Sequence, residues 1–105
     1  MLESIFQAKL IEELEYRFEG CIILKNDAGY VQGFPDLTIL YKDKWAVLEC
    51  KQNSQSPYQP NQEYYLDLLG KMSFASAIWP EIEEEVLDEL QQTFRHGRST
   101  RISKR

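Results

Sequence analysis

Apolar positions recur with helical spacing in three stretches of the chain. Residues 2–19 show apolar side chains every three or four positions without an intervening Pro or Gly, and Gly20 supplies a stop signal. The same spacing returns over 60–70, where Pro60 is tolerated in the first turn, and again over 80–94. Three amphipathic helices are therefore expected.

Short runs of β-forming residues separate these helices. They are bounded by turn-forming or strongly polar segments and therefore predict strands. The four runs cover residues 21–24, 36–41, 45–51 and 73–79. The expected order is helix, three strands, helix, strand, helix, which indicates an α/β domain with a mixed central sheet flanked by helices.

The chain length limits how many such units are present. With 105 residues, 43% of them apolar, the sequence supports one modest core, which we assign to residues 1–94. Residues 95–105 show no periodicity and are expected to form a flexible tail. A chain this short has little room for a separate recognition domain. A large substrate would therefore favour a homodimer.

The charge is distributed unevenly between these two parts. The net charge is −5, but without the last eleven residues the chain carries 7 basic and 17 acidic residues, a balance of −10. An acidic body with a basic tail is compatible with an electrostatic anchor for phosphates, or with a solubilising end. The candidate phosphate-binding residues of the tail are Arg95, Arg98, Arg101, Lys104 and Arg105.

Several classes of protein are disfavoured by composition. Cys21 and Cys50 form no CxxC pair and His96 is the single histidine, so a zinc site built from Cys and His is not expected. The sequence contains no apolar run of membrane length and no signal peptide. An intracellular, reducing location without membrane contact is the expectation.

The chemically informative residues lie on the second and third predicted strands. Alternation along a strand places Glu49 and Lys51 on one face and Cys50 on the other. A two- or four-residue loop around Asp43 and Lys44 would place Asp36 opposite Lys51, with both carboxylates on one face. A three-residue loop would place Asp36 opposite Cys50 and separate the carboxylates, unless a bulge corrected the register.

This set of side chains suits phosphodiester hydrolysis. Two carboxylates can hold a Mg²⁺ ion that keeps several waters, and the ion lowers the pKa of a bound water. A neighbouring ammonium group can offset the charge that develops on the phosphoryl oxygens. The simpler interpretation is a cross-strand ion pair between Asp36 and Lys51, because Glu-x-Lys is common by chance.

The wider pattern favours the catalytic interpretation. The run Gly33-Phe34-Pro35-Asp36, followed by Leu48-Glu49-Cys50-Lys51 and a helix bearing Gln62, resembles the PD-(D/E)xK nuclease superfamily. It is most similar to small stand-alone VRR-NUC-type and Holliday junction resolvase-like nucleases, over about residues 3–90. The resemblance implies a restriction-endonuclease-like core, dependence on a divalent metal and cleavage of DNA.

The resemblance also implies roles for individual residues. Asp36 and Glu49 would bind Mg²⁺, with Mn²⁺ as a substitute, and Lys51 would be the catalytic lysine. Gln62 would reach the site from the second predicted helix, or would otherwise be a surface glutamine. The family often adds a glutamate from the first helix, for which Glu3 is the candidate because it shares an inward-looking helical face with Leu10 and Leu14.

Two functions from different classes follow. The first is a Mg²⁺-dependent DNA endonuclease, specific for branched DNA such as Holliday junctions or acting as a flap or nicking nuclease. The second is a catalytically inactive binding module that keeps the nuclease fold and recognises a protein or nucleic acid. The acidic body fits the second function, whereas the joint presence of Asp36, Glu49 and Lys51 favours the first.

Three tyrosines in or beside the second predicted helix add an open question. Tyr58, Tyr64 and Tyr65 could stack on exposed bases, but aromatic residues at this spacing are more often part of a core or an interface.

Overall fold

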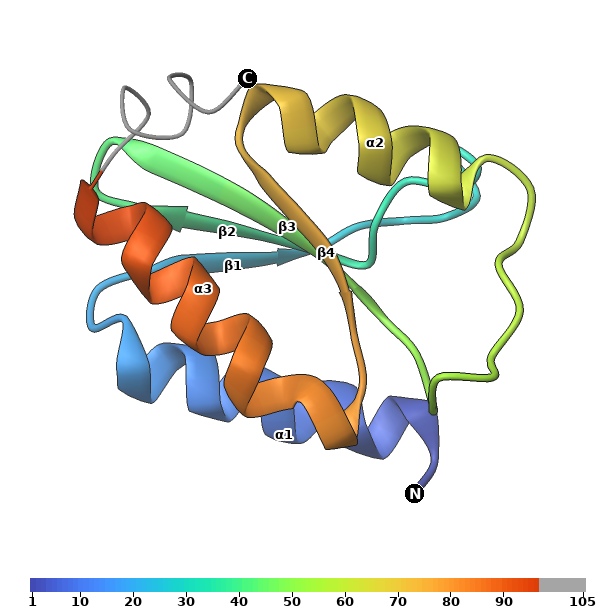
Figure 1. Ribbon diagram of the computed structural model, residues 1–105, viewed down its shortest axis with the longest axis horizontal. Helices are drawn as coiled ribbons and strands as arrows, with labels where there is room; N and C mark the ends of the chain where they lie inside the picture. Colours follow the sequence, from blue (N-terminus) through green and yellow to red (C-terminus); the bar gives the residue numbers. More distant parts are fainter. Residues whose placement is uncertain (97–105) are drawn as a thin grey trace.

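The computed structural model describes residues 1–96 and confirms the expected order of elements (Figure 1). Helix α1 (Glu3–Arg17) is followed by strands β1 (Ile22–Lys25), β2 (Leu37–Tyr41) and β3 (Lys44–Cys50). Helix α2 (Gln62–Met72) leads into β4 (Phe74–Ile78), and a 3₁₀ turn, η1 (Pro80–Ile82), precedes helix α3 (Glu83–His96).

The four strands form one mixed sheet in the order β1-β2-β3-β4. The first three strands are antiparallel neighbours, and β4 returns parallel to β3 after the α2 crossover. Helices α1 and α3 lie on one side of the sheet and α2 lies on the other, which gives a three-layer α/β arrangement (Figure 1). The helices thus cover the two faces of the sheet unequally.

The main core lies between the sheet and the α1–α3 layer. Alternation along β3 directs Ala46, Leu48 and Cys50 into this layer, where all three are fully buried. They pack with buried residues from the neighbouring elements, namely Phe6, Leu10, Leu14, Phe18, Leu37, Ile39, Ile78, Val86, Leu87, Leu90 and Phe94. The opposite face of β3 therefore presents Val47, Glu49 and, beyond the strand, Lys51 toward the α2 side.

The register of the β2–β3 hairpin differs from the expectation. The turn consists of Lys42 and Asp43, with Tyr41 paired to Lys44, so it is centred one residue earlier than a turn around Asp43 and Lys44 would be. Lys42 has φ 57°, a positive value at the first turn position as two-residue hairpin turns use. The ladder ends with Leu37 opposite Leu48, and its continuation places Asp36 beside Glu49. The prediction that Asp36 lies opposite Lys51 is therefore wrong, although both carboxylates share one face.

Some boundaries are also shifted. Helix α2 begins at Gln62, so Pro60 precedes the helix, and it continues past Gly70 to Met72. Helix α3 extends to His96, two residues beyond the expected helix end at residue 94. No helix within residues 1–96 is long and apolar enough to cross a lipid bilayer.

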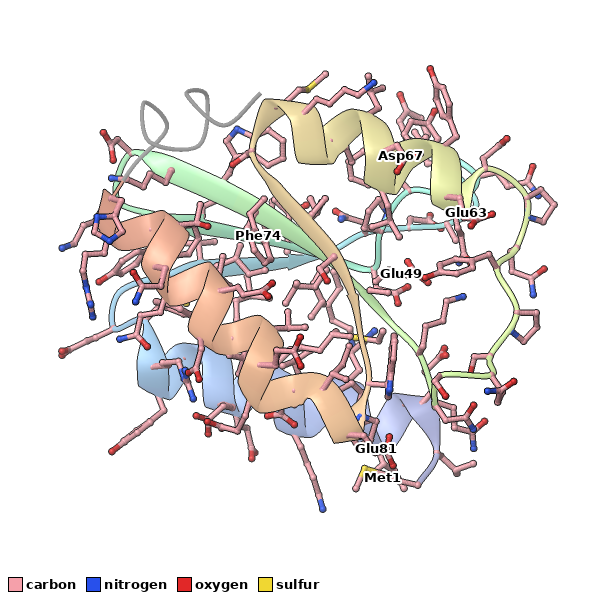
Figure 2. The ribbon with its side chains drawn as sticks, viewed as in Figure 1. Met1, Glu49, Glu63, Asp67, Phe74 and Glu81 are labelled. Carbon is pink, nitrogen blue, oxygen red and sulfur yellow. The ribbon has the colours of Figure 1, made fainter. Side chains whose placement is uncertain are left out.

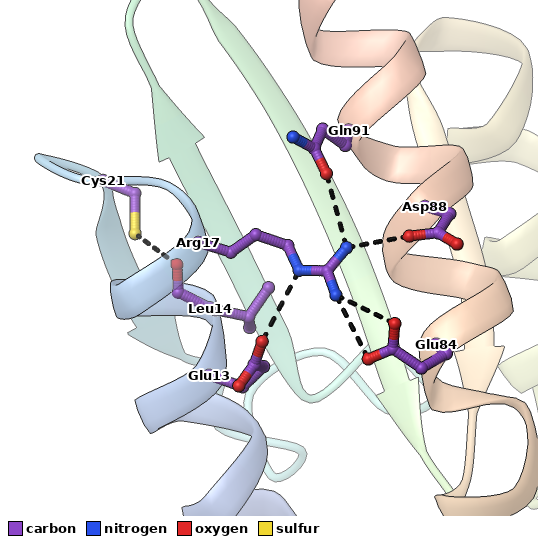
Figure 3. Close-up of polar contacts among 7 residues, drawn as sticks. All are labelled: Glu13, Leu14, Arg17, Cys21, Glu84, Asp88 and Gln91. Carbon is purple, nitrogen blue, oxygen red and sulfur yellow. Dashed lines mark hydrogen bonds and ion pairs between the residues drawn. The ribbon is translucent and has the colours of Figure 1, made fainter.

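A cluster of ion pairs joins α1 to α3 on the surface. The Arg17 guanidinium contacts Glu84 at 3.1 Å and Asp88 at 3.0 Å across the helix interface, and Glu13 at 3.5 Å within α1 (Figure 3). Gln91 also accepts a hydrogen bond from Arg17 at 3.4 Å. Part of the acidic run at the start of α3 is thus paired rather than only solvated.

Candidate active site

Asp36 and Glu49 meet at the end of the hairpin that is remote from its turn. Asp36 lies immediately before β2, and its Oδ2 accepts a hydrogen bond from the Cys50 backbone N–H at 2.9 Å. Glu49 belongs to β3 and is only 4% exposed, on the side of the sheet that α2 covers (Figure 2). The sequence prediction that these two carboxylates share a face is borne out in the geometry.

Gln62 links Glu49 to Lys51. Its Nε2 donates to Glu49 Oε2 at 2.8 Å, while its Oε1 accepts from Lys51 Nζ at 2.7 Å and from the Gln59 N–H at 2.7 Å. Lys51 Nζ also donates to the Pro57 carbonyl oxygen at 2.9 Å and lies 3.9 Å from Glu49 Oε2. Gln62 therefore reaches the site from the first turn of α2 and is not a surface glutamine.

One oxygen of Glu49 has no partner. Its Oε1 is buried without a hydrogen-bond partner of good geometry among the described residues, although the backbone and carboxyl group of Asp36 lie close to the Glu49 side chain. The pKa of Glu49 is raised from 4.5 to about 7, first by burial and next by the charge of Asp36, against the opposing effect of Lys51. Burial likewise raises the pKa of Asp36, although the Cys50 N–H and Lys51 act in the other direction. A buried carboxyl group, Glu49, and a partly buried one, Asp36, thus lie close together with incomplete compensation of their charges.

Gly33 allows α2 to approach the segment that carries Asp36. Its φ of +87° is accessible to glycine, and an added Cβ would lie 2.6 Å from Asn61 Cβ and 2.7 Å from the Pro60 carbonyl oxygen. Asn61 itself, the residue before α2, has φ 72°. The glycine of the Gly-x-Pro-Asp run thus serves the packing that brings Gln62 to Glu49.

Glu3 lies near the site but does not complete a cage. Burial, and next the charge of Asp36, raises the pKa of Glu3, yet its side chain is exposed at the start of α1. Within residues 1–96, no group of three or more His, Cys, Asp or Glu side chains is arranged to hold a metal ion. The geometry therefore brings together Asp36 and Glu49 and leaves Glu3 as a neighbouring charge.

Cys50 is an unsuitable nucleophile despite its position between Glu49 and Lys51. Its side chain points into the core and is fully buried. The pKa of the Cys50 thiol is raised to about 12, first by burial and next by the charge of Asp36. Because the thiolate is the reactive form, this cysteine is chemically inert at neutral pH.

The basic residues predicted to bind phosphate lie elsewhere. Arg95 is exposed in the last turn of α3 and lines a cavity of about 360 Å³ with Arg17, Lys42 and Lys44, near the hairpin turn at the other end of the sheet from Asp36. The remaining predicted phosphate contacts fall outside the described residues, namely Arg98, Arg101, Lys104 and Arg105.

Three groups at the site were not expected from the sequence. The Pro57 carbonyl and the Gln59 N–H are backbone groups of an irregular loop, which no side-chain pattern announces. The Tyr58 ring lies 4.7 Å from Lys51 Nζ and covers the ammonium group by a cation–π contact. Of these three groups, only Tyr58 is marked by the sequence, as one of the tyrosines that could stack on exposed bases.

The donor set fits a hard divalent cation. Mg²⁺ in proteins is commonly held by one or two carboxylates and retains several waters, so a pair such as Asp36 and Glu49 is the kind of donor set that this ion uses. Glu49 Oε1 has no hydrogen-bond partner, and a bound cation would compensate its negative charge. In comparisons with known proteins, no family model and no curated protein matches the chain.

Proposed function

We propose that the protein is a divalent-metal-dependent nuclease that hydrolyses phosphodiester bonds in DNA. The observation that carries the proposal is the buried Glu49 carboxyl group, which has an unpartnered oxygen and lies beside Asp36 and Lys51. Buried titratable groups with strongly shifted pKa values concentrate at functional sites, because catalysis needs acids and bases whose pKa values match their task.

The element order supports a related inference about the fold. A mixed four-stranded sheet, with the acidic residues at one end of the β2–β3 hairpin and helices on both faces, is what a restriction-endonuclease-like core would require. We infer membership of the PD-(D/E)xK class on this basis and on the Gly33-to-Asp36 and Glu49-to-Lys51 runs. The expected homodimer stays a prediction that sedimentation equilibrium would test.

Each residue has a distinct role in this proposal. Asp36 and Glu49 would hold Mg²⁺ or Mn²⁺, which when bound polarises the phosphoryl group and lowers the pKa of a bound water. Lys51 would donate to a phosphoryl oxygen as negative charge develops there. Gln62 is a positioning residue, because it fixes Glu49 and Lys51 through one amide group.

The decisive experiment is a cleavage assay on labelled linear, flapped and four-way-junction DNA with Mg²⁺, Mn²⁺, Ca²⁺ or excess EDTA. We expect cleavage with Mg²⁺ and Mn²⁺ and none with EDTA or Ca²⁺. Glu49→Gln should reduce the rate by roughly 10³-fold or more, because it removes a ligand charge while keeping the amide-sized shape. The matched control is Glu84→Gln, which changes an exposed glutamate of the Arg17 cluster.

Two results would overturn the proposal. Cleavage that persists in excess EDTA would exclude the metal-dependent site. If wild-type protein binds Mn²⁺ in a calorimetric titration but cleaves none of these DNAs, the site is a metal-binding module without nuclease activity. That outcome would favour the inactive binding module, which the acidic body also fits.

A further inference from the structure

Aromatic side chains lie on the segments that carry or flank the candidate active-site residues, and several are open to solvent. Tyr58 contacts the Lys51 ammonium group with its ring and remains 42% exposed. Tyr64 is 61% exposed and Tyr30 is 89% exposed. Such large exposed rings contribute little to folding in their present positions, so a partner that covers them would gain contact area.

Three of the rings form a connected row beside Asp36. The centroids of Phe34 and Tyr65 are 5.6 Å apart, and those of Tyr65 and Tyr64 are 5.1 Å apart, both in edge-to-face contacts. Phe34 precedes Asp36 by two residues, so the row begins at the segment that carries Asp36 and ends at the exposed Tyr64 on α2.

A cavity shares Phe34 with this row. It has a volume of about 400 Å³ and is lined by Asn26, Asp27, Tyr30, Val31 and Phe34. Its wall is fixed to the segment that carries Asp36, because the Asn26 N–H donates to the Asp36 carbonyl oxygen at 2.8 Å and Asn26 Nδ2 donates to the Pro35 carbonyl oxygen at 2.8 Å. The cavity combines two aromatic faces with polar groups, which suits a planar heterocycle.

The net negative charge of residues 1–96 disfavours a paired duplex as the ligand. Residues 1–96 contain 8 Lys and Arg residues against 17 Asp and Glu residues. Glu63 and Asp67 lie on α2, the helix that carries Tyr64 and lies above Glu49 in Figure 2. Binding of duplex DNA depends on basic side chains at the phosphates, whereas unpaired bases gain about 1–3 kcal/mol each by stacking on aromatic rings.

We propose that the site acts on nucleic acid with unpaired nucleotides beside the scissile phosphate. Their bases stack on Tyr58 and on Tyr64, and one base enters the cavity between Tyr30 and Phe34. This inference rests on the proposed nuclease function and adds its substrate class. A single-stranded segment can present its bases to these rings, whereas a continuous duplex keeps them stacked on one another.

The test measures binding separately from cleavage. A single-stranded oligonucleotide with one 2-aminopurine is titrated with the protein in excess EDTA, and the fully paired duplex of the same sequence is titrated in parallel. We expect tighter binding of the single strand, with quenching of 2-aminopurine as it stacks. Tyr64→Ala and Tyr30→Ala should each weaken single-strand binding by about 5- to 150-fold, which corresponds to 1–3 kcal/mol per base.

Matched variants control for general effects on folding. Tyr16→Ala changes a tyrosine on α1 that is 85% exposed and belongs neither to the row of rings nor to the cavity. It should leave single-strand binding unchanged. Tyr64→Phe keeps the ring and should bind like the wild type. Duplex binding should respond to none of these substitutions.

The outcomes separate this inference from the proposed function. Stacking that responds to the tyrosines in a protein that cleaves nothing with Mg²⁺ or Mn²⁺ would support the binding inference and overturn the nuclease. Metal-dependent cleavage of duplex DNA at a rate that Tyr30→Ala and Tyr64→Ala do not change would support the nuclease and overturn the binding inference. Equal affinity for single strand and duplex, or no binding of either, overturns the inference.

Discussion

Two clusters of charged side chains lie at different places in the molecule and are compensated very differently. Around Arg17, three carboxylates and an amide approach one guanidinium, and the partners Glu84 and Asp88 are largely exposed (Figure 3). Every partner there is also accessible to water. The Arg17 cluster therefore joins α1 and α3 without leaving a buried charge unpaired.

Around Glu49, the charged groups are buried and are only partly compensated. Glu49 and Lys51 are buried, Asp36 adds a second carboxyl group, and one oxygen of Glu49 lacks a partner. Burying charge with incomplete compensation destabilises the folded state, so this arrangement has no structural advantage over an apolar one. The number of charged groups in a cluster therefore says little about function. Incomplete compensation of a buried charge, in contrast, points to a ligand-binding role.

Removing the ammonium group from the Glu49 cluster should have the largest effect after the loss of the Glu49 carboxylate itself. Lys51→Met keeps much of the length of the side chain, and we expect the rate of DNA cleavage to fall by about 10²–10³-fold, because charge stabilisation at the phosphoryl group is removed. Mn²⁺ affinity, measured by calorimetry, should remain within a few fold of the wild type. The control is Lys44→Met, which breaks the exposed pair with Asp43. Wild-type cleavage by Lys51→Met would reduce Lys51 to a structural role.

The raised pKa of Glu49 should also make the free energy of unfolding of the metal-free protein depend on pH. The pKa of Glu49 is about 7 in the folded state and 4.5 ordinarily, so the folded state holds this proton more tightly. The stabilisation is complete below about pH 4.5 and is lost as pH rises through 7, with a total of roughly 3 kcal/mol. The raised pKa of Asp36 acts in the same direction.

Urea unfolding in EDTA between pH 5 and pH 8 checks this expectation. The wild type should lose stability relative to Glu49→Gln as the pH increases, and Mg²⁺ should restore part of the loss at pH 8 because it binds the charged form. Parallel pH profiles of the two proteins would show that Glu49 titrates near its ordinary value.

Disrupting the Arg17 cluster should have a smaller and purely structural effect. Arg17→Met keeps much of the side-chain stem and removes exposed ion pairs, so the free energy of unfolding should fall by about 1 kcal/mol. The loss should shrink in 1 M NaCl, where surface charges are screened. Cleavage rates should not change. A loss of activity without loss of stability would mean that this cluster contributes to substrate binding.

The smallest effect is expected from the charges beyond both clusters. Ending the chain after His96 removes Arg98, Arg101, Lys104 and Arg105 and keeps all of α3. If these residues bind phosphates, the slope of log affinity against log salt for a single strand should decrease by about 0.7 for each phosphate that the shortened protein no longer neutralises. An unchanged slope, measured by fluorescence anisotropy, would show that the tail does not bind nucleic acid.

The order of elements and the faces of β3 could be predicted from the sequence. Helical and strand spacings are strong in this chain, and strict alternation separates Glu49 and Lys51 from Cys50 whatever the pairing partner. The hairpin register could not be predicted, because it depends on a turn whose positive-φ position is occupied by Lys42. Lysine gives no signal for that conformation, whereas Gly or Asn would.

The assembly of the site was predictable only in part. Asp36, Glu49 and Lys51 follow from a short pattern on adjacent strands. The bridging role of Gln62 depends on where α2 begins, which is set by packing between Gly33 and Asn61 that are remote in sequence. Glu3 illustrates the opposite case, because helical periodicity placed it on an inward face while its position as the first residue of α1 leaves it exposed.

The close packing at Gly33 has a consequence for how the loop between Lys51 and Asn61 can vary in length. One end of this loop is held where the Lys51 N–H pairs with the Ile78 carbonyl oxygen, and the other is held where Asn61 packs on Gly33. Residues 53–55 between these anchors are exposed. Insertions there would lengthen the loop without displacing Gln62, because each doubling of loop length costs only about 0.6 kcal/mol. Proteins with the same site would then be recognised by the glycine and its partner helix rather than by a fixed interval from Glu49 to Gln62.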